Sequence, residues 1–468
     1  MEGKMKVVFI IPADDIRRSR LYRLGNRFYG HSNAITGPLI LGRILKDAGH
    51  TVEVYEELYH DINLKKAGDA DVICFYTMTT TAERAYALAD DFRRIGKRVL
   101  IGGMHASALP EEALRHADQV VVGEAERVIV DVVEGRITDR IVNAQCLENL
   151  DDIPFPDYSL LQGKREVANV MTSRGCPFSC NFCTTSRMFA PYRRRSPENV
   201  ISELRMYKEQ GFKYVNFEDD NFTADKDRAK EILRLMIKNH LVFRETFFFG
   251  RTDMAKDEEL LQLLHDAHLN RVLVGIESLN QKSLDYINKK QKIQDIEECS
   301  QALLKYRIRM IASLVLGLDC DSVQDIRNGV KFCKKIHAYQ LQPAVLTPFP
   351  NTPVYEQFAK EGRLLSNGWS HFDMMTVNFL PKNMSSWKLQ KEFLHAVASF
   401  YTFASSFVML KFFGVETCLR RLGMWLVIRV GRVCVLFISL VKNGNIFNRL
   451  RMQSVKAPGV LQPQTPNA

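Results

Sequence analysis

The chain has 468 residues, 46% of them hydrophobic and 25% charged, a globular composition that predicts two or three domains. Seven of the ten cysteines are scattered singly, which excludes a disulfide framework and favours a reducing cytoplasm. After residue 402, nine basic residues stand against one glutamate, so this tail carries +8 of the net charge of +10. The rest is nearly neutral, whereas nucleic-acid enzymes spread basic residues over the substrate channel, so we expect no nucleic-acid partner.

Residues 1–140 alternate strand-like and helix-like segments. Apolar runs predict strands at 5–11, 51–56, 71–76, 98–103 and 119–123. Amphipathic segments between them predict helices, one of which ends near Gly49. This alternation predicts a Rossmann-like α/β domain with a parallel sheet, whose ligands bind at the carboxyl ends of the strands. The first strand is followed by PADDIRRSR instead of a G-x-G-x-x-G motif, which disfavours a nicotinamide site.

Three segments that follow strands of this sheet carry a family resemblance. They are TMT (77–79), IGGMH (101–105) and VVGEAE (121–126). The layout resembles the cobalamin-binding domain that precedes many radical S-adenosylmethionine (SAM) barrels. The resemblance implies cobalamin contacts at Thr77, Thr79, Gly102, Gly103, His105 and Gly123. The paired glycines would let the backbone approach the corrin or its nucleotide tail.

This segment departs from the general cobalamin pattern in one respect. The D-x-H-x-x-G motif that supplies a cobalt-ligating histidine is missing after the first strand. We therefore expect cobalamin without a lower histidine ligand. The alternative is a Rossmann-like domain with no cofactor, and His105 is either a ligand contact or a structural loop residue.

A linker is expected at 141–165, because Pro154 and Pro156 interrupt regular structure. The next region, 166–385, predicts a second parallel α/β unit. Its strands are expected at 166–173, 213–220, 246–253, 270–278, 308–319 and 339–350. Ser196 and Pro197 predict the start of a helix between the first two strands. The polar residues at the carboxyl ends of these strands are the candidates for chemistry.

Cys176, Cys180 and Cys183 form C-x3-C-x2-C within SRGCPFSCNFCTT. A four-iron cluster normally takes four thiolates, so three ligands leave one iron open to chelate a substrate. A zinc knuckle would need a fourth ligand at paired spacing, and none follows. The spacing resembles that of the radical SAM enzymes, whose open iron binds SAM. The resemblance implies a partial (β/α)6 TIM barrel, a [4Fe-4S] cluster on these cysteines and cleavage of SAM to a 5′-deoxyadenosyl radical.

The same resemblance assigns the SAM contacts. Phe182 would lie beside the adenine, and Asp219, Asp220 and Asn221 would accept hydrogen bonds from the amino group. Arg251 would pair with the SAM carboxylate, unless it forms a salt bridge with Glu277 or Asp253. The remaining expected contacts are Glu277 to the ribose, and Leu316 and Gly317 to the adenine edge.

The segment 386–456 has helical spacing and forms the basic C-terminal extension, and 457–468 is expected to be disordered. Its most apolar stretch, 424–441, contains Arg429, Gly431 and Arg432, which disfavours a membrane span. Two alternatives remain open. The extension either caps the barrel or lies in a membrane interface, and both can hold together.

These observations predict a cytoplasmic, cobalamin-dependent radical SAM methyltransferase acting on an unactivated carbon of a hydrophobic substrate, such as a hopanoid-type lipid or a tetrapyrrole. One alternative is a non-methylating radical SAM enzyme of the same architecture that performs a cyclisation, an oxygenation or a rearrangement. The other is a non-catalytic iron–sulfur sensor, which would not need Asp219 or Glu277. The expected partners are the small-molecule substrate, an electron donor such as flavodoxin or ferredoxin, and the inner face of the membrane through peripheral contact.

Overall fold

The computed structural model describes residues 3–19, 23 and 32–441. Within it the chain divides into two compact units. Unit 1 comprises Met1–Pro177, Thr184–Asp220 and Gly368–Ser370. Unit 2 comprises Phe178–Cys183, Asn221–Asn367 and His371–Ala468. The cysteine motif is shared, since Cys176 belongs to unit 1 while Cys180 and Cys183 belong to unit 2.

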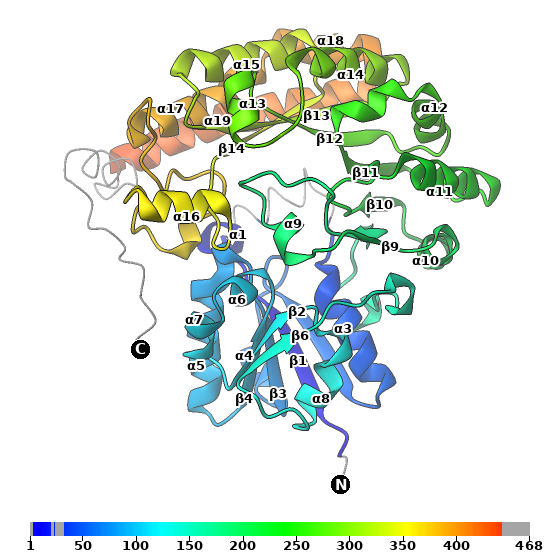
Figure 1. Ribbon diagram of the computed structural model, residues 1–468, viewed down its shortest axis with the longest axis vertical. Helices are drawn as coiled ribbons and strands as arrows, with labels where there is room; N and C mark the ends of the chain where they lie inside the picture. The colour runs from blue at the N-terminus through cyan, green and yellow to red at the C-terminus, as the bar shows by residue number, and fades with distance from the viewer. Residues whose placement is uncertain (1–2, 20–22, 24–31, 442–468) are drawn as a thin grey trace. The chain divides into compact units, whose positions relative to one another are not determined.

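Unit 1 is built on a six-stranded parallel sheet in the order β2-β1-β3-β4-β5-β6 (Figure 1). Its strands are β1 (Lys6–Ile11), β2 (Thr51–Glu56), β3 (Val72–Tyr76), β4 (Arg98–Gly102), β5 (Gln119–Gly123) and β6 (Ile141–Ala144). The sheet confirms the predicted Rossmann-like α/β domain with a parallel sheet and its first five strands.

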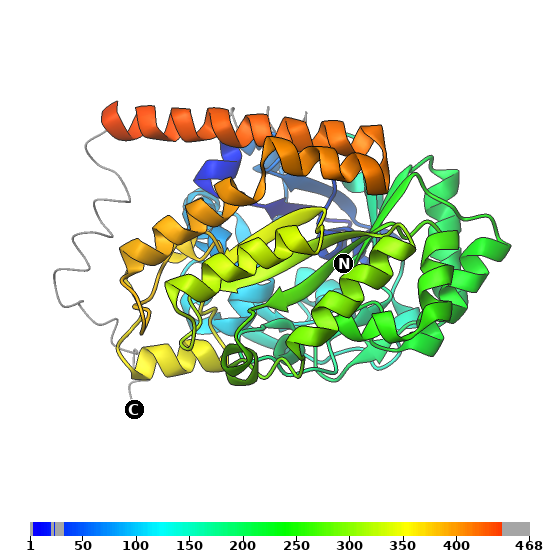
Figure 2. The same ribbon diagram turned by 90° about the horizontal axis from the view of Figure 1, so that it is seen from above.

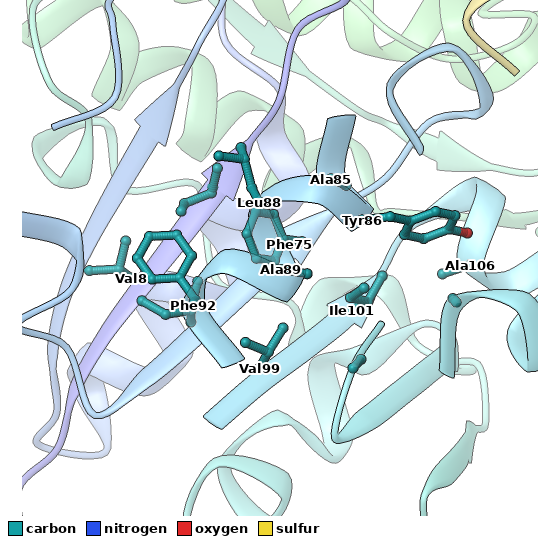
Figure 3. Packing of buried hydrophobic residues seen from close by; sticks show 14 of the residues in the cluster. Val8, Phe75, Ala85, Tyr86, Leu88, Ala89, Phe92, Val99, Ile101 and Ala106 are labelled. Atoms are coloured by element: carbon teal, nitrogen blue, oxygen red, sulfur yellow. The ribbon is translucent and has the colours of Figure 1, made fainter. Parts of the chain in front are cut away.

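Helices cover both faces of this sheet. One face carries α5 (Ala82–Arg94), α6 (Met104–Ala108) and α7 (Pro110–Leu114), and the other carries α3 (Thr36–Asp47) and α8 (Ile129–Val133). Alternate strand residues point to opposite faces, so Val8 and Phe75 pack under α5, whereas Phe9 and Cys74 face α3. Figure 3 shows the core on the α5 side, where Phe75 meets Leu88, Ala89 and Phe92. Burial of each such large side chain contributes about 1.5–3 kcal/mol.

The segment expected to be a linker needs one correction. Residues Ile141–Ala144 form β6, which pairs in parallel with β5 from Val120↔Ile141 onward. The physical reason is that Val142 completes the apolar surface at the sheet edge and is buried there. Beyond it, only the short 3-10 turns Leu150–Asp152 and Tyr158–Leu160 interrupt the segment, as the prolines predict.

Unit 1 also contains the start of the second α/β region. Here β7 (Val167–Val170) pairs in parallel with β10 (Tyr214–Phe217). Ser196 caps α10 (Pro197–Glu209) by accepting a hydrogen bond from the Asn199 N–H, as predicted. Two further strands, β8 (Ser173–Arg174) and β9 (Arg193–Arg194), pair antiparallel and enclose the loop that carries the cysteines and α9 (Thr185–Met188).

Unit 2 holds the other strands of the second sheet, in the parallel order β14-β13-β12-β11. They are β11 (Glu245–Gly250), β12 (Arg271–Glu277), β13 (Arg309–Leu316) and β14 (Gln340–Val345). The accompanying helices are α11 (Lys226–Lys238), α12 (Glu258–Asp266), α13 (Gln281–Tyr286), α14 (Ile293–Lys305), α15 (Val323–Lys335) and α16 (Pro353–Lys360). Each predicted strand of the region is therefore present within a few residues of its expected bounds.

Three helices complete unit 2: α17 (Ser386–Phe400), α18 (Phe403–Phe413) and α19 (Val415–Val441). Figure 2 shows them along one side of the unit, with α18 and α19 side by side. Met409 of α18 joins a cluster with Ile311 of β13 and Tyr339, so this helix packs against the strands of unit 2, and the predicted barrel cap stays a prediction. The predicted disorder at 457–468 lies outside the described residues.

A helix that spans a membrane must be both long and apolar. None of the described helices alone combines the two properties. The pair Ser386–Phe400 and Phe403–Phe413 meets these requirements only when taken together, and it is bent by 54°.

Candidate functional site

The cysteine loop begins at a glycine that the fold requires. Gly175 has φ +80°, and a Cβ there would collide with the Phe189 carbonyl. The loop continues into unit 2, where the Asn181 side chain donates to the Tyr286 carbonyl at 2.8 Å and its N–H donates to the Ile287 carbonyl at 3.2 Å. These bonds fix the middle of the motif against the segment after α13.

The three cysteines are half-buried, and none of them is part of a disulfide. Their donor chemistry fits an iron–sulfur cluster, because thiolates on one short loop are the usual ligands. Among the described residues, however, no three His, Cys, Asp or Glu side chains are already gathered around a metal position. The assignment of the cluster to these thiols therefore stays a prediction.

The charge around Cys180 comes from residues of unit 2. Burial raises the pKa of this thiol, and Glu277 and Cys183 act in the same direction, while Lys289 and Arg251 oppose them. A ligating cysteine must lose its proton, so the two cations favour the form that binds metal. Lys289 was missed in the sequence, where it reads as one of several surface lysines in INKKQK.

Glu277 and Arg251 lie together at the carboxyl ends of β12 and β11. Glu277 has φ +63° beside a bulge in β12, and its carboxylate binds Lys289 Nζ at 2.6 Å. The Arg251 guanidinium donates to the Lys289 carbonyl at 2.7 Å and stacks 3.8 Å above the Phe178 ring. The sequence leaves open a salt bridge between Arg251 and Glu277. In the structure Lys289, and not Arg251, forms the salt bridge with Glu277.

In the acidic segment after β10, some polar groups are hydrogen-bonded within the fold and others are not. Asp219 is buried and accepts hydrogen bonds from Thr172 N at 3.1 Å, Thr172 Oγ1 at 2.7 Å and the Ser173 hydroxyl. Asp220 is exposed. The Asn221 amide oxygen accepts from Thr223, which leaves its buried amide nitrogen without a hydrogen bond in the described structure. The free N–H donor of Asn221 suits the carboxylate of SAM better than its ammonium group, which is the partner that the sequence predicted.

The other predicted SAM residues occupy unit 2. Phe182 is half-buried on the cysteine loop. Leu316 is buried at the end of β13, and its carbonyl accepts from Leu346 N–H at 2.9 Å. Gly317 has φ +91°, and a Cβ there would lie 2.5 Å from a Leu389 methyl of α17. The glycine is therefore explained by helix packing, and a contact with adenine stays a prediction.

Unit 1 contains a cavity of about 290 Å³ on the α3 face of its sheet, near the carboxyl ends of β3, β4 and β5. Gly102, Gly103 and Gly123 line it, together with mostly apolar side chains. A Cβ on Gly102 would meet only the Val121 carbonyl, at 3.5 Å, so this glycine leaves open space beside it. No histidine lines the cavity among the described residues, and the expectation of a cobalamin without a lower histidine ligand stays a prediction.

The remaining predicted cobalamin residues lie outside the wall of this cavity. The Thr77 hydroxyl donates to the Gly102 carbonyl at 2.8 Å and holds the turn after β4. His105 is fully buried between Thr79 and Glu112, at 3.3 and 3.1 Å, and its ring lies edge-on to Trp369. These contacts account for the histidine as a structural loop residue, and cofactor contacts at these three positions stay predictions.

A buried charge cluster joins the cavity to the base of the cysteine loop within unit 1. Arg174 of β8 pairs with Glu124 at 2.9 Å and with Glu126 at 2.6 Å. Arg193 of β9 also donates to Glu124, at 3.0 Å, and to the Leu147 carbonyl at 2.5 Å. Arg174, Glu124 and Glu126 line the cavity. The sequence contains both halves, VVGEAE and SRGC, but gives no sign that they pair.

Comparison with family models assigns both regions. A model of the radical SAM superfamily matches residues 170–333, and a model of the B12 binding domain matches residues 34–133. The chain therefore carries both a radical SAM domain and a B12-binding domain, and it resembles the group of proteins that combine the two.

Three curated relatives illustrate the range of this group. The chain is 28% identical over 385 residues to bacteriochlorophyllide d C-8(2)-methyltransferase of Chlorobaculum tepidum, a match that covers 75% of this chain and 82% of the relative. It is 27% identical over 282 residues to hopanoid C-2 methylase of Rhodopseudomonas palustris (57% and 53% covered). It is 23% identical over 369 residues to the anaerobic magnesium-protoporphyrin IX monomethyl ester cyclase of Cereibacter sphaeroides (69% and 59% covered).

Two solved structures share the fold. The radical SAM methyltransferase TsrM of Kitasatospora setae, with cobalamin and a [4Fe-4S] cluster bound, superposes with a TM-score of 0.67 at 15% identity, covering 93% of this chain and all of that one. The cobalamin-dependent radical SAM enzyme OxsB, with aqua-cobalamin and SAM bound, also gives 0.67, at 13% identity and with 97% and 75% covered. Both confirm the predicted architecture.

Proposed function

We propose that this protein is a cobalamin-dependent radical SAM C-methyltransferase whose substrate is a hydrophobic tetrapyrrole or polycyclic lipid. The observation that carries the proposal is the glycine-lined cavity of unit 1, connected through Arg174 to the base of the cysteine loop. The cavity lies at the carboxyl ends of parallel strands, where a domain of this fold binds its cofactor.

The residues of the chain have distinct tasks in this proposal. Cys176, Cys180 and Cys183 would hold the [4Fe-4S] cluster, with Arg251 and Lys289 favouring the thiolate form of Cys180. Glu277 and Asn221 would hold SAM through a carboxylate and a free amide donor. When bound, the cluster and SAM supply a 5′-deoxyadenosyl radical, and cobalamin carries the methyl group.

The substrate class comes from the relatives and not from the geometry. Two of the relatives named above are a bacteriochlorophyllide methyltransferase and a hopanoid methylase. We test the class with anaerobically reconstituted, cobalamin-loaded protein, a low-potential reductant such as reduced flavodoxin, and SAM whose methyl group is isotopically labelled. Label should enter a bacteriochlorophyllide or a hopanoid. If neither accepts label while SAM is still cleaved, the proposed substrate class is wrong.

A second candidate is a cyclase that does not methylate, and the relationship to the magnesium-protoporphyrin cyclase favours it. The two candidates differ in the fate of SAM. A methyltransferase releases S-adenosylhomocysteine as well as 5′-deoxyadenosine, whereas a cyclase has no need of the first product.

A further inference from the structure

A second cavity lies in unit 2, away from the strand ends that carry the SAM residues. Its volume is about 490 Å³, and it opens at the amino ends of β11, β12 and β13, the ends opposite to Arg251 and Glu277. Its charged lining consists of five basic residues and two acidic ones: Arg244, Arg307, Arg309, Lys411, Arg420, Glu245 and Glu416. The cavity thus carries a net positive charge and no assigned role.

The deep end of this cavity has too few carboxylates for its guanidinium groups. Glu245, the first residue of β11, is 7% exposed and pairs with Arg271 at 2.8 Å, Arg309 at 3.0 Å and Arg420 at 3.1 Å. Burial raises the pKa of Glu245, but the three arginines outweigh it and leave the pKa lowered. Three cations around one buried anion repel one another, so a further anion would stabilise the group.

The helices that border the cavity present apolar side chains to solvent. Two stripes at helical spacing are 44–64% exposed: Phe403, Phe407 and Leu410 on α18, and Val415, Leu419, Leu426 and Val430 on α19. Phe403 packs edge-on against Phe407 and Trp425, with ring centroids 5.1 and 5.7 Å away. Aromatic residues beside a basic face are typical of helices that lie in a membrane interface.

The opposite sides of the same helices are firmly held to unit 2. Arg421 donates to the carbonyls of Ala338 at 2.8 Å and Tyr339 at 2.5 Å and stacks over Phe400. Met409 and Cys418 are buried. The exposed stripes are therefore the outward faces of well-anchored helices.

We propose that the α18–α19 hairpin docks on an anionic lipid surface, with a headgroup phosphate in the basic cavity and the apolar stripes at the boundary of the acyl chains. A soluble phosphate would explain the cavity but leave the stripes exposed. A second copy of this chain would bring two positive cavities together, which like-charge repulsion opposes. An anionic bilayer complements both features, and the proposal is independent of the reaction catalysed.

The test uses full-length reconstituted protein and sedimentation with vesicles of phosphatidylcholine alone or mixed with phosphatidylglycerol. Binding should require phosphatidylglycerol and fall as salt rises, because screening shortens the reach of surface charge. The double variant Arg307→Gln/Lys411→Gln should weaken binding by roughly tenfold or more. Phe403→Ser/Phe407→Ser should weaken it without changing its salt dependence. The matched control is Lys282→Gln/Lys360→Gln, two exposed lysines of unit 2 outside the cavity, and it should bind like the parent.

Three results would overturn the proposal. The first is equal binding to neutral and anionic vesicles, or none at low salt. The second is a charge variant that matches its control. The third is a protein that does not bind vesicles but either binds glycerol 3-phosphate tightly in calorimetry or forms a dimer that the phenylalanine variant abolishes. Because binding is measured without turnover, failure here is distinct from failure of the proposed function.

Discussion

Gly102 and Gly103 are adjacent residues at the end of β4 with different structural demands. Gly103 has φ +98°, and a Cβ there would lie 2.7 Å from both the N and the O of Thr77. Gly102 has room for a Cβ, whose nearest neighbour would be the Val121 carbonyl at 3.5 Å. The first glycine is therefore available to the ligand, whereas the second is required by the fold.

Gly102→Ala should thus lower the retention of cobalamin while leaving the thermal midpoint of the apoprotein within a few degrees of the parent. The added methyl group occupies space beside the cavity and strains nothing else. Gly103→Ala is the contrasting variant, and it should lower the thermal midpoint itself, because a side chain at this φ clashes with the Thr77 backbone. Spectrophotometric titration with hydroxocobalamin and calorimetry measure both effects. Full retention by Gly102→Ala would remove this glycine from the proposed site.

Glu218 also lines the cavity of unit 1, although no sequence motif singles it out. Burial, together with the charges of Asp219 and Glu56, raises its pKa from 4.5 to about 8. A raised carboxyl pKa stabilises the folded state below the unfolded pKa, and this contribution is lost as pH rises through about 8.

Glu218→Gln should therefore make the apoprotein more stable than the parent at pH 9, with the advantage vanishing near pH 4. Urea unfolding at a series of pH values measures it. The exposed Glu148→Gln serves as the control, and its stability should follow the parent across the range. If the two variants give the same pH profile, Glu218 does not hold a proton in the folded protein.

Among the elements, the two-residue strands β8 and β9 position the loop that carries the cysteines. They hold the ends of the cysteine loop, and each contributes one arginine to the cluster around Glu124. Burial raises the pKa of Glu124, but hydrogen bonds and charges from Arg193 and Arg174 outweigh it, so the pKa is lowered. The contribution of Glu124 to stability is thus present above pH 4.5 and is lost as pH falls through its folded pKa.

Glu124→Ala should lower the free energy of unfolding by about 3–5 kcal/mol near neutral pH, because two buried arginines lose their shared partner. It should also reduce iron incorporation, since both ends of the cysteine loop lose a fixed position. The exposed Glu209→Gln should change stability by no more than about 0.5 kcal/mol. Chemical denaturation and iron analysis provide the measurements. A variant with normal stability and normal iron content would show that the cluster does not position the loop.

The elements also show which parts of the fold could be predicted from the sequence. Apolar runs located eleven strands, and Ser196 with Pro197 located a helix start, because these signals are local. The strand β6 was missed because its short edge segment has little apolar pattern of its own. The Glu124 cluster and Lys289 were missed because their partners lie 12 to 69 residues away in the chain. The predicted domain boundaries and cofactor contacts stay predictions.

At the scale of the whole molecule, the residues proposed to hold the cofactors are divided between two units. Unit 1 contains the glycine-lined cavity and Cys176. Unit 2 contains Cys180 and Cys183 with the charged groups that face them. This distribution agrees with the presence of both a B12-binding and a radical SAM domain. It is the basis for expecting two uses of SAM, one as a radical source and one as a methyl donor.

The most direct test of this account is the ratio of the two products of SAM during turnover. Reconstituted, cobalamin-loaded protein is supplied with reductant, SAM and a hydrophobic ring substrate, and both products are quantified by mass spectrometry. We predict S-adenosylhomocysteine and 5′-deoxyadenosine in a ratio near one, with 5′-deoxyadenosine abolished when Cys176, Cys180 or Cys183 is replaced by alanine. Formation of 5′-deoxyadenosine without S-adenosylhomocysteine while the substrate is consumed would contradict the methyltransferase.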